Sequence, residues 1–327
     1  MAKNKVQWGM IGTGSVTELK SAPSFNKIKN SSLVSVGNRT PEKAADYASR
    51  HGIPKWHKDP YDVIRDPEVD IVYIATPPGS HPEYAIETIR AGKPVYIEKP
   101  LANTWDDCQL INEAALRAGI PVYVAYYRRS LDYFLKVKEI IDAGSLGQLL
   151  SIHMQQHFIA REEDKDPENL PWRVIPEISG GGYFHDVGCH ALDIVFYIFG
   201  DPLGAVGQKS NLGGLYPPED TVTASIRLQG DLLVSGNWSF ISPEAFVQDR
   251  IYVTGEKGTL EFSVFSFDPI TLKLGNEVKN LSPKGPEHIQ QPLIQSIVSE
   301  MLGEGRCPST GETAAITSLV MDQILGT

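Results

Sequence analysis

Two ionisable side chains stand at positions where they could handle a proton or a developing negative charge. Lys99 follows an apolar, strand-like run in the segment VYIEKPLA, and His190 lies in the segment GGGYFHDVGCHALD. An ammonium at the end of a buried strand needs a partner or an exit to water. An imidazole titrates near neutrality and can therefore act as a general acid or base. The pair indicates acid-base chemistry, although a strand that simply surfaces at Lys99 is the alternative.

The surroundings of His190 strengthen this interpretation. Asp186 precedes His190 by four residues and Asp193 follows it by three, so all three share one face of a helix expected over residues 183–199. A carboxylate beside an imidazole can orient a general base. A structural histidine is the competing interpretation. We expect Cys189 to pack as a small apolar residue and His185 to lie on another face.

A glycine-rich turn follows the first expected strand. In WGMIGTGSVT, Gly12-Thr13-Gly14 comes directly before Ser15 and Val16. Glycines at such a turn let a pyrophosphate approach backbone N–H groups at the start of a helix. The third small position of the pattern is occupied by Thr17, where glycine or alanine is usual. The turn predicts dinucleotide binding, against the alternative of a tight turn without a ligand.

The residues after the second strand bear on which dinucleotide binds. An acidic residue there would hold the ribose 2′-hydroxyl of NAD. The sequence instead has Asn38 and Arg39, and a guanidinium suits a 2′-phosphate. The sequence therefore favours NADP over NAD, unless Arg39 is merely solvated.

Later strand ends supply further candidates for the same site. Thr76 and Pro77 end the strand expected over 69–75, and His81 opens the next helix as a residue near the cofactor. Glu98 and Lys99 end the following strand, and parallel strands meet a ligand at their carboxyl ends. Lys99 is thus expected beside the nicotinamide. Whether Pro100 is cis cannot be read from the sequence.

The elements that position these residues fall into two classes. Over 1–126, apolar runs alternate with helical patterns, which predicts a doubly wound parallel (Rossmann) sheet, with strands at 6–11, 33–36, 69–75, 94–97 and 121–125. Over 127–327, alternating segments predict an open, mostly antiparallel sheet for substrate binding and oligomerisation, with strands at 151–158, 221–228, 232–240, 250–254, 259–264 and 270–274. Pro23 should kink or shorten the first helix.

Composition excludes several classes of partner. The 327 residues carry a net charge of -10, which disfavours nucleic acid and anionic membranes. Cys108, Cys189 and Cys307 are too few and too far apart for a disulfide framework or a zinc site. No signal peptide or membrane span is evident. We expect a cytoplasmic protein with a small-molecule ligand and no metal.

Together these motifs resemble the glucose-fructose oxidoreductase, inositol dehydrogenase and MocA (Gfo/Idh/MocA) family of NAD(P)-dependent oxidoreductases. The resemblance spans nearly the whole chain, through GMIGTGSV, EKPLA, WR, the triple glycine before Asp186 and His190, and TGEKGTLEF. It implies that Lys99 lies beside the nicotinamide, that His190 is the acid-base residue and that Asp186 is its partner or a substrate ligand. It also implies a homodimer or homotetramer.

The expected reaction is hydride transfer between the nicotinamide and a secondary alcohol or ketone carbon of a sugar, inositol or related polyol. Candidate substrate contacts are Tyr127, Trp172, Arg173, Asp186 and His190, although the two aromatic residues could equally be packing residues. One alternative is a redox-silent protein that senses a cofactor or sugar. The other is a dihydrodiol-type dehydrogenase on the same fold.

Overall fold

Residues 4–326 are described by a computed structural model, and they form two compact units. The first unit holds the chain up to Leu131 together with Pro286–Ala315, and the second holds Asp132–Gly285 and the residues from Ile316 onward. The division falls after Leu131, five residues beyond the expected boundary at 126/127, and residues 286–315, expected in the second domain, pack with the first unit. Each unit is described below by itself.

The first unit contains a six-stranded sheet in which all neighbouring strands are parallel. The strand order is β3-β2-β1-β4-β5-β6, which confirms the doubly wound sheet predicted from the sequence. The strands are β1 (Val6–Ile11), β2 (Ser31–Gly37), β3 (Lys55–His57), β4 (Ile71–Ile74), β5 (Val95–Ile97) and β6 (Val122–Val124).

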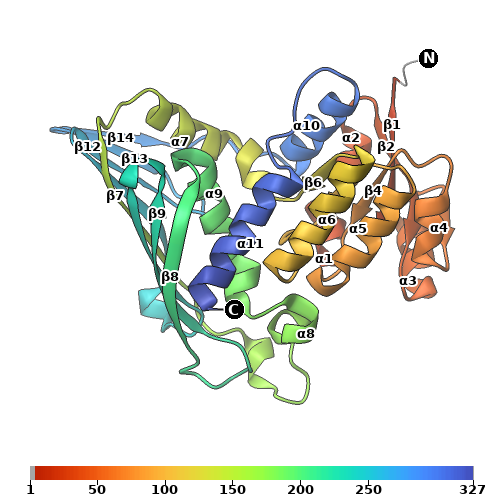
Figure 1. The fold of residues 1–327 in the computed structure, drawn as a ribbon, viewed down its shortest axis with the longest axis horizontal. Helices are drawn as coiled ribbons and strands as arrows, with labels where there is room; N and C mark the ends of the chain where they lie inside the picture. The colour runs from red at the N-terminus through yellow and green to blue at the C-terminus, as the bar shows by residue number, and fades with distance from the viewer. Residues whose placement is uncertain (1–3, 327) are drawn as a thin grey trace. The chain divides into compact units, whose positions relative to one another are not determined.

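Helices connect these strands (Figure 1). They are α1 (Ser15–Leu19), α2 (Ala22–Lys27), α3 (Pro41–His51), α4 (Pro60–Arg65), α5 (His81–Arg90) and α6 (Trp105–Ala118). The unit also contains α10 (Gln291–Met301), which comes much later in the chain and connects none of these strands. As expected, the helix after β1 is interrupted near Pro23, which lies in the first turn of α2. Gly52 ends α3 in the left-handed conformation that glycine adopts without a steric penalty.

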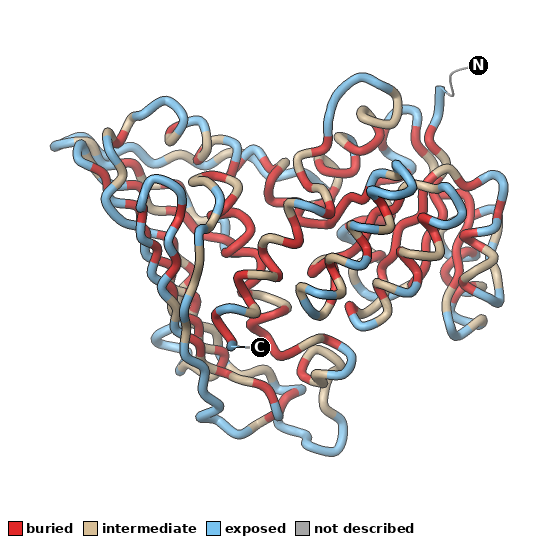
Figure 2. Tube along the Cα trace, in the orientation of Figure 1, coloured by how far each residue is buried: buried red, intermediate tan, exposed pale blue. Residues whose placement is uncertain are grey.

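The core of the first unit contains an aromatic cluster. The rings of Trp8 and Phe25 have centroids 4.5 Å apart, and those of Tyr73 and Tyr96 stack at 4.9 Å. All four residues are fully buried. Figure 2 shows the central strands of this sheet buried along most of their length, as expected for a parallel sheet covered on both faces.

The second unit contains an eight-stranded sheet of order β14-β13-β12-β11-β7-β10-β9-β8. Only the β7–β10 pair is parallel, so the prediction of a mostly antiparallel sheet is confirmed. Its strands are β7 (Leu149–His157), β8 (Pro202–Ser210), β9 (Thr221–Leu228), β10 (Leu233–Ser239), β11 (Gln248–Gly255), β12 (Gly258–Phe262), β13 (Ile270–Leu274) and β14 (Glu277–Leu281). Its helices are α7 (Asp132–Asp142), α8 (Pro176–Ser179), α9 (Cys189–Phe199) and the C-terminal part of α11 (Gly311–Leu325).

One face of this sheet is covered by helices, and the other is exposed. On the covered face Phe134 of α7 meets Phe262 at 6.4 Å, and Phe184, just before α9, meets Trp238 at 5.0 Å. On β10, buried and exposed positions alternate, which is typical of a sheet with one solvated face. None of the helices within residues 4–326 has the length and apolar character that a membrane crossing requires.

Candidate active site

The register of the parallel sheet brings the candidate residues of the first unit to one edge. Ile11 pairs with Ile74, and Ile74 pairs with Ile97. Thr13, Thr76 and Lys99 each lie two residues beyond one of these isoleucines. They therefore follow three adjacent strands at the carboxyl edge, next to the point where strand order reverses between β1 and β4. This is where a doubly wound sheet binds its ligand.

The glycine turn after β1 has the geometry that a pyrophosphate site needs. Gly12 has a φ of +100°, and a Cβ there would approach the Ala75 carbonyl oxygen to 2.6 Å. Gly14 is different, because a Cβ at this position would meet nothing within 4 Å. Gly12 is thus required by the fold, whereas Gly14 leaves open space that a cofactor phosphate could enter. The residues of the turn therefore fit a dinucleotide.

Thr17, the departure from the glycine pattern, is accommodated inside the unit. Its hydroxyl donates to the Gly14 carbonyl at 2.8 Å, and its own carbonyl accepts from the hydroxyl of Tyr47 in α3 at 2.7 Å. Thr17 is fully buried. Thr17 therefore contributes to the packing between α1 and α3. The exposed Ser15 and the half-buried Val16 at the start of α1 remain accessible to a ligand.

Asn38 and Arg39 follow β2, whose last residue, Gly37, pairs with Ile11. The Asn38 amide donates to the hydroxyl of Thr13 at 2.7 Å, so it ties the two turns together. Arg39 is exposed, and its guanidinium makes no hydrogen bond or ion pair with any residue that the structure describes. Its charge is therefore available to an anionic ligand.

His81 begins α5, as expected, but its imidazole is occupied by the protein itself. Nε2 lies 2.8 Å from the Thr76 carbonyl oxygen, and Nδ1 lies 3.1 and 3.2 Å from the carbonyls of Pro100 and Leu101. Burial lowers the pKa of His81 to about 4, and the charge of Lys99 acts in the same direction. His81 thus joins the turn after β4, which contains the half-buried Pro77, to the turn after Lys99.

Glu98 explains why a lysine can follow a buried strand. Its carboxylate is buried and accepts from the Tyr73 hydroxyl at 2.6 Å and from the Gln290 amide at 2.7 Å. With Glu98 held inward, Lys99 on the next position is half-buried at the sheet edge. The Lys99–Pro100 peptide is cis. Glu98, expected among the cofactor contacts, is thus placed in an internal network.

The catalytic candidates of the second unit lie on a widened helical turn. The expected helix over 183–199 is a π-helical turn, Phe184–Gly188, followed by α9. Asp186 lies in the π turn, and His190 is 5% exposed in the first turn of α9. Asp193 is buried one turn further on. Single π turns within helices occur frequently at functional sites.

The structure brings two more candidates to Asp186. The Nε of Arg173 donates to Oδ2 of Asp186 at 3.1 Å, and the Arg173 guanidinium stacks over the ring of Trp172 at 4.6 Å. The side chains of Arg173 and Trp172 are partly exposed. Tyr127 belongs to the first unit, where it is buried with Arg128 over its ring at 4.9 Å. Its surroundings favour the packing alternative.

Two features of these surroundings were not found from the sequence. Gln290 lies 192 positions from Glu98, and no local pattern reveals such a contact. His185, expected on another helix face, is buried with its Nδ1 4.0 Å from Oε1 of Glu219. Burial lowers the pKa of His185 to about 4 and raises the pKa of Glu219.

Lys99 belongs to the first unit and His190 to the second. Within the described residues, no group of three or more His, Cys, Asp or Glu side chains is arranged to hold a metal ion.

Comparison with known proteins gives consistent results. Residues 6–126 match the model of an oxidoreductase family with an NAD-binding Rossmann fold, and residues 134–261 match the GFO/IDH/MocA C-terminal domain. The chain is 35% identical to "Oxidoreductase P35" of Formosa agariphila, over 99% of this chain and 100% of that protein. It is 27% identical to the 1,5-anhydro-D-fructose reductase of Ensifer adhaerens, over 94% and 91%.

Among solved structures, the aldose-aldose oxidoreductase of Caulobacter crescentus superimposes with a TM-score of 0.87 at 24% identity, over 98% of this chain and 96% of that one. This likeness confirms the fold of both units.

Proposed function

Because the chain belongs to the Gfo/Idh/MocA family of oxidoreductases, we propose that it transfers a hydride between a nicotinamide cofactor and a secondary alcohol or ketone carbon of a sugar, inositol or related polyol. The observation that carries the proposal is the row of Thr13, Thr76 and Lys99 at the carboxyl edge of the Rossmann sheet. The substrate class is supported by the relatives named for anhydrofructose and aldoses.

The proposed roles follow from the chemistry of each side chain. In the oxidation direction His190 accepts the proton of the alcohol, and Lys99 donates a hydrogen bond to the reacting oxygen and stabilises its negative charge. Asp186 orients His190 or binds a substrate hydroxyl, and Arg173 and Trp172 supply a donor and an apolar ring face for the substrate. A nicotinamide cofactor held at this edge would supply the acceptor or donor of the hydride.

A turnover screen tests the proposal. NAD and NADP are each paired with neutral cyclic polyols, free sugars, sugar acids and aromatic dihydrodiols, and nicotinamide absorbance is followed. We expect activity on a polyol or sugar. Activity confined to dihydrodiols would contradict the substrate class. Cofactor binding without turnover on any compound would favour a redox-silent sensor.

We further propose that NADP binds more tightly than NAD, since the exposed guanidinium of Arg39 is available to a 2′-phosphate. Arg39→Ala should weaken NADP binding roughly tenfold and leave NAD binding unchanged. Fluorescence titration of both cofactors decides the matter, with Arg117→Ala on the exposed face of α6 as the control. A wild-type preference for NAD would contradict this proposal.

A homodimer or homotetramer is also proposed, formed through the exposed face of the second unit's sheet. Tyr252, His153, Ser235, Ser225 and Val206 form one row of aligned positions across five strands of that face. Tyr252 and Val206 are 36% and 70% exposed. Light scattering after size exclusion, on wild type and on Val206→Glu, tests the assembly. A monomeric wild type would contradict it.

A cytoplasmic location is proposed from the three buried cysteines, which suit a reducing compartment. Cell fractionation checks this location.

A further inference from the structure

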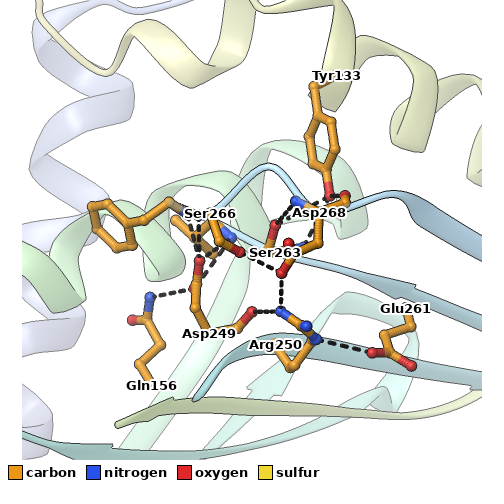
Figure 3. A network of polar contacts seen from close by, with 10 residues as sticks. Tyr133, Gln156, Asp249, Arg250, Glu261, Ser263, Ser266 and Asp268 are labelled. Atoms are coloured by element: carbon orange, nitrogen blue, oxygen red, sulfur yellow. Dashed lines mark hydrogen bonds and ion pairs between the residues drawn. The ribbon is translucent and has the colours of Figure 1, made fainter. Parts of the chain in front are cut away.

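The first residues of the loop between β12 and β13 are held by one carboxylate. Three consecutive backbone N–H groups, those of Val264, Phe265 and Ser266, donate to Oδ2 of Asp249 at 3.0, 2.6 and 2.9 Å (Figure 3). Asp249 lies on β11 and is 6% exposed. A buried carboxylate with three converging donors fixes the backbone strongly.

The far end of the same loop is fixed independently. The Tyr133 hydroxyl donates to the Asp268 carbonyl at 2.7 Å, and Arg250 donates to the Asp268 carboxylate at 2.6 Å. Between the two ends, Phe267 has a φ of +51°, a conformation that a bulky residue adopts only when its surroundings impose it. Contacts at both ends therefore hold the loop in the conformation seen in the structure.

This conformation places an aromatic ring against the proposed acid-base residue. The rings of Phe265 and His190 have centroids 5.6 Å apart and planes at 80°, an edge-to-face arrangement. Phe265 is itself packed edge-to-face on Phe158 at 5.8 Å. Edge-to-face contacts have a preferred geometry, so a fixed Phe265 restricts the plane in which the His190 imidazole can lie.

A second chain of contacts leads from Asp249 to the same helical turn. Gln156 donates from its amide to Oδ1 of Asp249 at 3.2 Å and accepts from the Trp238 indole at 2.8 Å. Trp238 packs edge-to-face on Phe184, which opens the π turn before His190. The fit is close, because a Cβ on Gly188 would come within 2.6 Å of the Phe184 ring.

We propose that Asp249 is a positioning residue for His190, and that it acts through Phe265 and, by a second route, through Gln156 and Trp238. Neither Asp249 nor Phe265 is required to touch the reacting atoms. One test of the proposal, the catalytic rate, rests on the proposed function, because it depends on proton transfer by His190. The other test, the orientation of the His190 imidazole, needs no turnover.

The decisive comparison uses two substitutions of Phe265. Phe265→Tyr keeps the aromatic edge against His190, and Phe265→Leu keeps an apolar side chain without it. We expect near-wild-type kcat for the tyrosine variant and a kcat lowered roughly tenfold for the leucine variant, with unchanged cofactor affinity, because misplacement of a catalytic group mainly slows the chemical step. Phe246→Leu, at an exposed aromatic residue of the same unit, is the control.

Asp249→Asn tests whether the Asp249 carboxylate positions His190. In asparagine one of the two carboxylate oxygens becomes an NH2 group, which would face either the three N–H groups or the Gln156 amide with a second donor. We therefore expect a loss of kcat at least as large as in Phe265→Leu, and no further loss in the double variant with Phe265→Leu. Asp66→Asn, at a buried carboxylate of the first unit, controls for general destabilisation. Additive effects of the two substitutions would overturn the proposal. If Asp249→Asn fails to fold, the Phe265 pair still decides.

Nitrogen-15 NMR of labelled histidine side chains provides the readout that is independent of activity. The His190 signals are assigned by their loss in His190→Gln. We expect them to shift and broaden in Phe265→Leu but not in Phe265→Tyr or Phe246→Leu. Unchanged His190 signals in Phe265→Leu would overturn the proposal. Shifted signals in a protein that turns over no substrate would instead count against the proposed function alone.

Discussion

At the scale of single residues, the backbone at Lys99, a proposed catalytic residue, is fixed by its neighbours. Glu98, the residue before it, is held inward by Tyr73 and Gln290. His81 joins the turn that follows Lys99 to the turn that follows the neighbouring strand β4. The ammonium can therefore be directed by the backbone rather than by its own flexible side chain. A group that stabilises a developing charge, as proposed for the Lys99 ammonium, must be held in place before the reaction.

Lys99→Met and His190→Gln should each lower kcat by about 10²-fold or more, because positioned acid-base groups typically contribute 10² to 10⁴. Cofactor affinity should change little. Steady-state kinetics and cofactor titration measure the two effects separately, with Lys58→Met and His51→Gln, at the C-terminal end of α3, as controls of the same residue types. Near-normal turnover in both active-site variants would remove them from the mechanism.

The two glycines of the first turn should respond differently to alanine. Gly14→Ala should leave the melting temperature unchanged, since its Cβ would contact nothing, but weaken cofactor binding roughly tenfold, which corresponds to about 1.4 kcal/mol. Gly12→Ala should lower the melting temperature because of its positive φ and the contact with Ala75. Thermal unfolding and titration give both quantities.

Gly204→Ala is the matched control, because a Cβ there also meets nothing and the residue lies on β8 of the second unit. Wild-type cofactor affinity in Gly14→Ala would show that the open space beside Gly14 is not a phosphate site.

At the scale of elements, sequence patterns located the buried strands but did not identify the exposed strands at the two edges of the second sheet. The strands β9 and β13 begin and end as predicted, since alternating apolar residues define them. The strands β8 and β14 were missed because they lie at the sheet edges and are mostly exposed, so no apolar pattern marks them. The π turn was missed because the pattern of a helix does not report its local widening.

The same reasoning applies to the candidate site. Gly12 and Lys99 could be placed from the sequence because each follows a recognisable strand. The partners of Glu98 and the loop around Phe265 could not, because these contacts join residues far apart in the chain.

Acid should destabilise the turns that the buried histidines hold. His81 and His185 have pKa values lowered to about 4, so each is neutral when folded and takes up a proton on unfolding below its ordinary pKa of 6.5. Their contribution to the free energy of unfolding is therefore complete above pH 6.5 and declines as the pH falls toward 4, by up to about 3 kcal/mol each. Glu219, whose pKa is raised, acts in the opposite direction.

Urea denaturation between pH 7.5 and 5 measures this slope. His81→Asn should be less stable at pH 7.5 and should show a shallower decline toward pH 5. An equally steep decline in His81→Asn would mean that other groups take up the protons.

At the scale of the whole molecule, the chain returns to its first unit after building the sheet of the second. Gln290 donates to Glu98 and accepts from the Tyr96 hydroxyl at 2.8 Å. Tyr123 pairs with Thr310, and the Ser309 hydroxyl donates to the Val124 carbonyl at 2.7 Å. The Rossmann unit is therefore completed by residues that lie beyond 285.

Gln290→Ala should lower the free energy of unfolding by about 1 to 3 kcal/mol, since it removes a partner from a buried carboxylate and from a buried hydroxyl. Chemical denaturation measures the change. Gln295→Ala, on an exposed position of the same helix, is the control and should change stability by less than about 0.5 kcal/mol. Equal effects of the two substitutions would show that Glu98 does not depend on Gln290.

The late return of the chain also constrains the order of events during translation. A ribosome has synthesised all strands of the second sheet, the last of which ends at Leu281, before it delivers Gln290, Ser309 and Thr310. At ordinary elongation rates the N-terminal segment waits on the order of ten seconds or more for these residues. During this interval the nascent Rossmann segment lacks Gln290, one of the two donors to Glu98, and lacks the contacts of Ser309 and Thr310 with β6. It is therefore the part of the chain with most to gain from a chaperone.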